Sequence, residues 1–181
     1  VTLPVSTPAV DNSWSLVQTT GRLVAGTSAD YPPFAYYNAS YALDGFDVAL
    51  IRLIGQKLGV QVDVQDYAFD GLSSALQIGQ INVAIAAISV TPERQQQLGF
   101  SSIYYSGQEG MLAGQNSAIN SITSVDALAP YRVGVQAGSV YETWLRTSLV
   151  DSGSMPAANL LVYPRIDGAL TDVQAGLIDV V

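Results

Sequence analysis

The sequence predicts an α/β protein with mixed, mostly parallel sheets. From Gly21 onward, short apolar stretches typical of strands alternate with segments of helical periodicity, as in a sheet whose strands are joined by helices. A helix–strand unit also occurs twice in similar form, which indicates two lobes. Because 49% of the 181 residues are apolar and only 12% are charged, the chain can bury a substantial core.

In the first half, residues 22–28 predict a buried strand, and the two prolines of residues 31–34 predict a turn. Residues 47–59 predict a helix, because apolar residues recur on one face and Gly59 is a natural end. A strand over 60–67 follows.

Next, residues 70–79 predict a helix capped by Asp70, and the apolar stretch 81–89 predicts a strand at the centre of the sheet. The chain is strand-like again as far as Leu112. A short helix is predicted near residues 124–129.

The second half repeats this plan. Residues 131–138 and 159–164 predict strands, and residues 139–149 predict a helix capped by Ser139. Residues 70–84 then align without a gap with residues 167–181, and identical residues at the two places include Asp, Gly, Gln, Ile and Val. Any such unit can share a capping Asp, a terminal Gly and an apolar strand; the alternative, which we favour, is two lobes built from similar units.

The domain organisation follows from these patterns. We expect an N-terminal linker over residues 1–20, which are rich in Pro, Thr and Ser, a first lobe over 21–110 and a partial second lobe over 111–181. No run of apolar residues is long enough for a membrane span, and the start lacks the charged and apolar regions of a signal peptide.

The composition excludes several classes of function. A net charge of −8, with Lys57 as the single lysine, argues against nucleic acid and anionic membranes as partners. The absence of His and Cys excludes thiolate metal sites, Cys nucleophiles and Ser–His triads. The spacing of Asp44, Asp47 and Asp70 is not that of a calcium loop, so we expect neither a metal nor a cofactor.

One arginine is placed where local physics disfavours it. Thr91 and Pro92 predict the start of a helix, so Arg94 falls in its first turn. The helix dipole puts partial positive charge at this end and favours a carboxylate there. Either the Arg94 side chain is merely solvated, or an anion meets it.

Four motifs in order carry a resemblance to a known family: "GTSADYPPF" (26–34), "LDGFDVALIRLIGQKLG" (43–59), "YAFDGLSSALQIGQINVAIAAISVTPERQQQLGFSSIYY" (67–105) and "YRVGVQAGSVYE" (131–142). Together they resemble the polar amino-acid-binding proteins of ABC importers, the bacterial extracellular solute-binding proteins of family 3. The resemblance implies the two-lobed type II periplasmic binding protein fold, and no single motif decides it.

The resemblance assigns roles to residues of the first lobe. Arg94 lies where the family holds the ligand α-carboxylate in a bidentate guanidinium fork, next to a helix N-terminus. Ser89 and the carbonyl of Ala87 lie where it accepts the α-ammonium. Tyr31 and Phe69 lie where aromatic rings sandwich the ligand side chain.

Further roles fall on the second lobe and on Ser28. Gly138 and Ser139 open a helix whose N–H groups would also reach the carboxylate, and Gln136 and Tyr141 occupy positions that touch the ligand side chain. Where binders of cationic side chains in the family carry an Asp, this chain has Ser28. That departure argues against lysine-like or arginine-like specificity, although an Asp is found two residues later.

A second departure concerns the end of the sequence. In the family, an aspartate for the ligand ammonium, a second crossover and C-terminal helices follow the position of Val181. We therefore expect the chain to be truncated at its C-terminus.

The function implied by the resemblance is capture of an L-amino acid or similar small polar solute between two lobes and its delivery to the membrane subunits of an ABC importer. The protein would then be periplasmic or extracellular, possess no enzymatic activity and be tethered as a lipoprotein. Two alternatives remain open: a ligand-sensing domain of a signalling receptor, and an enzyme on the same fold, which would need a positioned acid or base.

Overall fold

The computed structural model describes residues 12–115, 117, 119 and 121–181. Its first lobe is built on a parallel three-stranded sheet in the order β5-β1-β6, formed by Gln61–Asp66, Arg22–Thr27 and Val83–Ala84. The strand β1 is therefore central. The prediction of a long central strand over 81–89 is wrong, because β6 has only two residues and lies at the edge of this sheet.

Helices cover both faces of the first sheet. Alternate residues of β1 point to opposite faces, so Leu23 packs with Ile51 of α2 (Phe46–Leu58), whereas Val24 packs with Leu72 of α3 (Leu72–Gln77). The helix α2 ends at Gly59 in the left-handed conformation, as predicted.

The start of α3 differs from the prediction. A 3₁₀ turn, η1 (Phe69–Gly71), precedes the helix, and no side chain caps either element. The expectation that Asp70 caps this helix is therefore wrong.

The N-terminal part of the chain contains a helix where a linker is predicted. The helix α1 (Ser13–Thr20) buries Val17, which is 2% exposed and packs with Leu23. The predicted linker is therefore wrong for this part, and its residues 1–11 lie outside the described residues.

An antiparallel ribbon leads from the first strand into α2. It consists of β2 (Asp30–Tyr31), β3 (Ala35–Tyr37) and β4 (Leu43–Asp44), and the predicted proline turn lies between β2 and β3. Gly45 then has a φ of 122°, and a Cβ atom there would lie 2.3 Å from the carbonyl oxygen of Phe34. Only glycine fits at this join.

The second lobe is built on the parallel pair β7 (Val133–Gln136) and β8 (Leu160–Tyr163). The helix α6 (Ile166–Ala175) follows β8, and the short helix predicted before β7 is η2 (Val125–Leu128). The predicted helix over 139–149 is α5 (Val140–Leu145) continued by a π-helical turn, Arg146–Val150.

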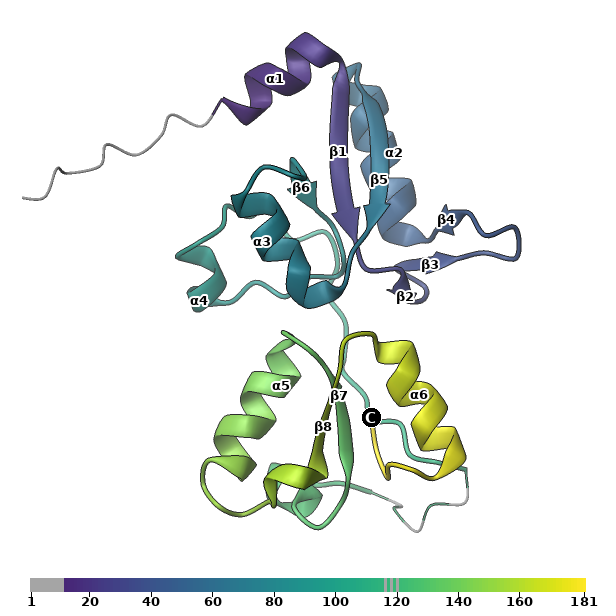
Figure 1. Cartoon of the computed structure of the whole chain (residues 1–181), viewed down its shortest axis with the longest axis vertical. Helices are drawn as coiled ribbons and strands as arrows, with labels where there is room; N and C mark the ends of the chain where they lie inside the picture. The colour runs from purple at the N-terminus through teal and green to yellow at the C-terminus, as the bar shows by residue number, and fades with distance from the viewer. Residues whose placement is uncertain (1–11, 116, 118, 120) are drawn as a thin grey trace, which may run out of the picture.

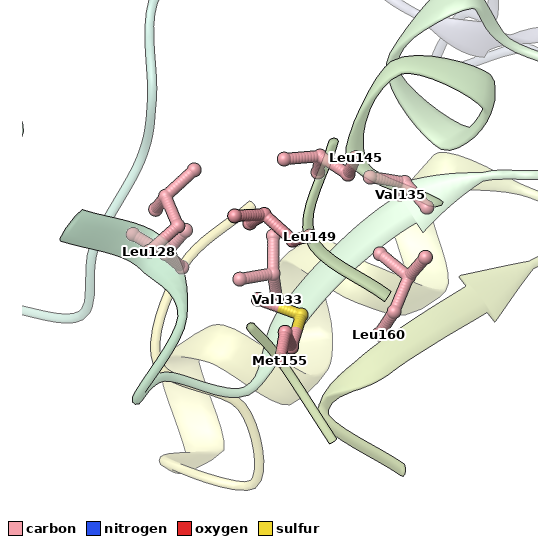
Figure 2. Packing of buried hydrophobic residues seen from close by; sticks show 8 residues of the cluster. Leu128, Val133, Val135, Leu145, Leu149, Met155 and Leu160 are labelled. Atoms are coloured by element: carbon pink, nitrogen blue, oxygen red, sulfur yellow. The ribbon is translucent and has the colours of Figure 1, made fainter. Parts of the chain in front are cut away.

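The core of the second lobe lies between β7 and the helices that follow it. Figure 2 shows Leu149 at its centre, with Val133 and Met155 beside it. All three side chains are at most 2% exposed. Figure 1 shows this lobe below the first one, with one segment of irregular chain running between them.

The two aligned stretches of sequence have similar structures where each helix gives way to the segment that follows it. Gly79 and Gly176 follow their helices in the left-handed conformation, with φ values of 73° and 72°. Ile81 and Ile178 follow them, and each is 2% exposed. Both isoleucines lie against a glycine of the neighbouring strand, at a position where a Cβ atom would come within 2.6 Å of the isoleucine Cδ1.

The next residue in each unit ties the unit to its sheet in the same way. The side-chain oxygen of Asn82 accepts a hydrogen bond from the N–H of Val24 at 2.8 Å. In the other lobe, the carboxylate of Asp179 accepts one from the N–H of Arg132 at 2.7 Å. The predicted internal similarity therefore extends to individual backbone contacts.

The segment between the lobes lacks the strand expected there. Residues 101–112 have no regular secondary structure, and most of their side chains are exposed. Leu112 and Val181 exchange backbone hydrogen bonds at 2.9 and 2.8 Å, and Ala113 bridges to Val180. We retain a proposed lobe boundary near residue 110. In the described part of the chain, no helix has the length and apolar character needed to cross a bilayer.

Candidate functional site

A cavity of about 1070 Å³ lies between the two lobes. Of the predicted ligand contacts, all except Gly138 line it: Ser28, Tyr31, Phe69, Ala87, Ser89, Arg94, Gln136, Ser139 and Tyr141. Gly138 lines a smaller pocket of about 70 Å³, which shares Arg94 and Phe69 with the cavity. The structure thus brings together residues from several separate elements.

The arginine of the site, Arg94, lies in the first turn of the short helix α4 (Pro92–Gln95). The predicted cap is confirmed, because the Thr91 hydroxyl accepts a hydrogen bond from the N–H of Arg94 at 3.3 Å. The guanidinium donates to the carbonyl oxygens of Ser89 at 2.8 Å and Gly138 at 3.0 Å. Its Cζ atom lies 5.7 Å from the centre of the Phe69 ring.

No carboxylate among the described residues forms an ion pair with Arg94. Burial lowers its pKa, but an arginine stays protonated at neutral pH. The side chain is therefore a half-buried cation held by two carbonyl dipoles, one from each lobe. Such a group favours an anion in the cavity.

The helix that faces Arg94 from the second lobe is already capped by its own residues. Ser139 accepts a hydrogen bond from the N–H of Glu142 at 3.2 Å, and the Glu142 carboxylate accepts one from the N–H of Gly138 at 2.8 Å. Gly138 therefore faces Arg94 with its carbonyl and not with the N–H group that the sequence analysis expected. The spacing of Ser139 and Glu142 is that of a capping box and is the signal that could have shown this.

An aspartate that the sequence analysis left without a role links the lobes. The carboxylate of Asp30 is 3% exposed and accepts hydrogen bonds from Ser28 Oγ at 2.6 Å and Gln136 Nε2 at 2.8 Å. It also accepts one from the N–H of Ile166, the first residue of α6, at 2.7 Å. Asp30 lies in the sequence between two predicted ligand contacts, Ser28 and Tyr31, and this position could have identified it as a site residue.

The comparison with protein families decides where this site belongs. The sequence model of the bacterial extracellular solute-binding proteins, family 3, matches residues 23–179. The chain belongs to this family. The match contains both lobes and every predicted ligand contact.

Individual relatives of this family 3 chain agree in description. The arginine-binding extracellular protein ArtP of Bacillus subtilis (strain 168) is 36% identical over 121 residues, which are 67% of this chain and 46% of ArtP. The histidine-binding periplasmic protein of Salmonella typhimurium (strain LT2) is 29% identical over 158 residues, 87% of this chain and 58% of the relative. The chain spans about half the length of these curated relatives.

A solved structure shows the same two-lobed architecture. It is an ancestral arginine-binding protein bound to arginine, with a TM-score of 0.80 and 33% sequence identity. The likeness covers 88% of this chain and 68% of that one. The relatives named here are described as binding proteins.

The family 3 loop that carries Ala87 is held by a buried carboxylate. Ala87 has a left-handed backbone, with a φ of 48°, and its N–H donates to Asp47 Oδ2 at 2.8 Å. The Asp47 side chain is fully buried, and burial raises its pKa while hydrogen bonds from Ala87 and Tyr104 oppose that rise. A left-handed backbone is strained in a non-glycine residue, so it needs support from its surroundings. The hydrogen bond to Asp47 stabilises this conformation of Ala87 and thereby fixes the position of the loop.

Aromatic side chains form much of the cavity wall. Tyr31 stacks on Phe34 with ring centres 5.6 Å apart, and Tyr105 meets Phe34 edge-on at 5.0 Å. Burial raises the pKa values of Tyr31 and Tyr141, and Glu109 raises both further, through its charge at Tyr31 and through a hydrogen bond and its charge at Tyr141. The sequence analysis missed Tyr105 and Glu109, because both lie in the crossing segment that it expected to be strand-like.

Gly138 allows the lobes to approach closely, which yields a prediction. Its φ is 71°, and a Cβ atom there would lie 2.9 Å from the Cβ of Asp70 in the first lobe. We expect Gly138→Ala to hold the lobes apart and weaken ligand binding about tenfold, in addition to a strain of about 1–2 kcal/mol. Calorimetric titration of both proteins measures this.

Gly153 offers the matched control. It also has a left-handed backbone, with a φ of 78°, but no atom lies within 4 Å of its added Cβ position. Gly153→Ala should therefore cost similar stability and leave ligand affinity unchanged. Equal affinities for the two variants would contradict a role of Gly138 in closure.

Proposed function

We propose that this chain binds an L-amino acid in the cavity between its lobes, and that the whole protein delivers the amino acid to the membrane subunits of an ABC importer. The observation that carries the proposal is Arg94, a half-buried cation that faces the cavity without an acidic partner among the described residues. An amino-acid carboxylate has the charge and the two oxygens that a guanidinium fork recognises.

The α-carbon of the ligand is recognised on the first lobe. When the lobes separate, the Gly138 carbonyl moves away from Arg94. The ligand carboxylate then takes its place as a partner of the guanidinium. The α-ammonium meets Ser89 and the carbonyl of Ala87, whose orientation Asp47 maintains. These roles rest on the family resemblance together with the shared cavity.

The ligand side chain extends toward the aromatic wall. Tyr31 and Phe69 contact it from the first lobe, and Gln136 and Tyr141 contact it from the second. Ser28 also lines the cavity and is 2% exposed. Closure of the second lobe, with Gly138 and Ser139 at the start of α5, then buries the ligand.

The proposed location and chemistry follow from the same reasoning. The protein acts in the periplasm or outside the cell, tethered as a lipoprotein, where solutes reach an importer. The ligand is bound and released unchanged, because the cavity recognises it through a cation, carbonyl groups and aromatic rings. No nucleic acid takes part, in line with the net charge of −8.

The test is a thermal-shift titration of the chain with the L-amino acids and their D-enantiomers. We expect a stereospecific rise in melting temperature with one chemical class of L-amino acid, because a ligand that binds only the folded state stabilises it. The ligand should be recovered unchanged after incubation. A chain whose melting temperature responds to no amino acid would refute the proposal, and so would turnover of the ligand.

A further inference from the structure

Asp30 determines which atoms two of the proposed ligand contacts can offer. Its buried carboxylate accepts hydrogen bonds from Ser28, Gln136 and the N–H of Ile166, and all of these distances are between 2.6 and 2.8 Å. The inference rests on the proposed function and concerns the side-chain end of the cavity, the part that would hold the ligand side chain. We propose that Asp30 makes this end select a cationic, hydrogen-bond-donating group, a guanidinium or an ammonium. It does so by turning Ser28 and Gln136 into acceptors.

The first step concerns Ser28. A serine hydroxyl has one proton to donate and two lone pairs to accept with. Because a carboxylate only accepts, the 2.6 Å contact with Asp30 Oδ1 fixes the Ser28 proton in that direction. Ser28 lines the cavity, so its oxygen is then left to accept a hydrogen bond from the ligand.

The second step concerns Gln136. Which end of a glutamine amide is nitrogen has to be judged from its hydrogen bonds, and here the partner is a carboxylate. The Nε2 group therefore faces Asp30, at 2.8 Å. The amide oxygen has no hydrogen-bond donor among the described residues and remains an acceptor. Both side chains thus present oxygen lone pairs, and a ligand that also accepts would leave them unpaired.

The third step is the balance of charge. Arg165 lies near Asp30 but pairs with Asp66 at 3.2 Å, so these three groups together keep one negative charge. Glu109 adds a second negative charge close to Tyr31 and Tyr141. Arg94, the cation on the cavity wall, is held by carbonyl groups at the end assigned to the ligand carboxylate. The side-chain end of the cavity therefore favours a positive ligand group.

This reasoning reverses an expectation from the sequence. Ser28 in place of a family aspartate argues against a cationic ligand when residues are considered one at a time. In the folded chain, Asp30 takes over the role of the missing carboxylate, because its hydrogen bond with the Ser28 hydroxyl makes the Ser28 oxygen an acceptor. A purely structural role for Asp30, as a link between the lobes and a partner for the start of α6, predicts something different: its loss would weaken all ligands equally.

The experiment compares each cationic ligand with a neutral analogue of similar shape. Titration calorimetry at fixed salt would measure L-arginine against L-citrulline and L-lysine against L-norleucine. For the wild-type chain we expect at least one cationic ligand to bind about tenfold or more tightly than its neutral analogue, because norleucine has no donor for the buried acceptors, while citrulline lacks the charge and places a carbonyl oxygen where arginine has an N–H donor. If the neutral analogues bind as tightly as the cations, the inference is wrong and the proposed function stands.

The decisive variant is Asp30→Asn. If the Asn oxygen keeps Gln136 and Ile166, its amide N–H₂ faces Ser28, which must then turn its own proton toward the ligand. We expect the preference for the cationic ligand to fall toward unity, and an unchanged ratio would overturn the inference. Ser28→Ala removes the same acceptor without burying a new polar group and serves if Asp30→Asn fails to fold.

The matched control is Asp63→Asn. Asp63 is on the same lobe and is paired with Arg22, but it does not line the cavity. This variant should keep the wild-type ratio of affinities. If the wild-type chain binds none of the four ligands and no other amino acid, the proposed function fails and the inference fails with it. If it binds only amino acids with neutral side chains, the inference alone fails.

Discussion

Replacing Arg94 by alanine is expected to weaken amino-acid binding by about 2–5 kcal/mol, or roughly 30-fold to several thousand-fold. The reason is that the ligand carboxylate would be enclosed between the lobes without its only proposed cationic partner. The carbonyl groups of Ser89 and Gly138, which now accept from the guanidinium, would repel it as well. Titration calorimetry with the ligand found by thermal shift measures the loss.

Two further variants sharpen this test. Arg94→Lys keeps the charge but not the fork, so it should recover only part of the affinity. Arg22→Ala removes an exposed arginine of the same lobe, whose side chain is 58% exposed and which lies outside the cavity, and it should bind as the wild type does. Wild-type affinity in Arg94→Ala would show that the ligand carboxylate is bound elsewhere.

Replacing Leu149 by alanine is expected to cost about 2–5 kcal/mol of unfolding free energy. Its side chain is 0% exposed and lies among Val133, Leu145 and Met155 (Figure 2), so its removal leaves a cavity that the rigid neighbours cannot close. Urea denaturation of the ligand-free chain, followed by circular dichroism, gives the change.

The control for this variant is Leu177→Ala. Leu177 belongs to the same lobe but is 58% exposed, so its loss should change stability by no more than about 0.5 kcal/mol. A loss of unfolding free energy below about 1 kcal/mol in Leu149→Ala would mean that the second lobe is loosely packed and has no specific core around Leu149.

The elements that could be predicted from sequence are those whose signals are local. The periodicity of α2 and its end at Gly59 depend on neighbouring residues alone, and so does the cap of α4 at Thr91. Strand pairing is not local. The apolar stretch 81–89 has the composition of a central strand, yet only β6 pairs with β1. The strand-like segment 101–112 has no regular secondary structure and pairs with another segment at its end, where Leu112 and Val181 exchange backbone hydrogen bonds.

The same distinction applies to the site. The conflict between Arg94 and the dipole of its own helix could be seen in the sequence, and the structure places this residue on the cavity wall. The role of Asp30 could not, because two of its partners, Gln136 and Ile166, come from the other lobe. The orientation of Gly138 differs from the prediction because the Glu142 carboxylate, four residues later, already accepts a hydrogen bond from its N–H.

The way the lobes meet has an energetic consequence. Each buried apolar cluster lies within one lobe, whereas the contacts that join the lobes include the hydrogen bonds of Arg94 and Asp30 and the ion pair of Arg165. Water can replace such polar partners at small net cost. The heat capacity rises chiefly when apolar surface is exposed to water. Separation of the lobes should therefore change the heat capacity little, whereas unfolding of either lobe should change it much. The ease with which the lobes separate and the stability of each lobe are therefore set by different residues. Mutations that change one of these properties can leave the other largely unchanged.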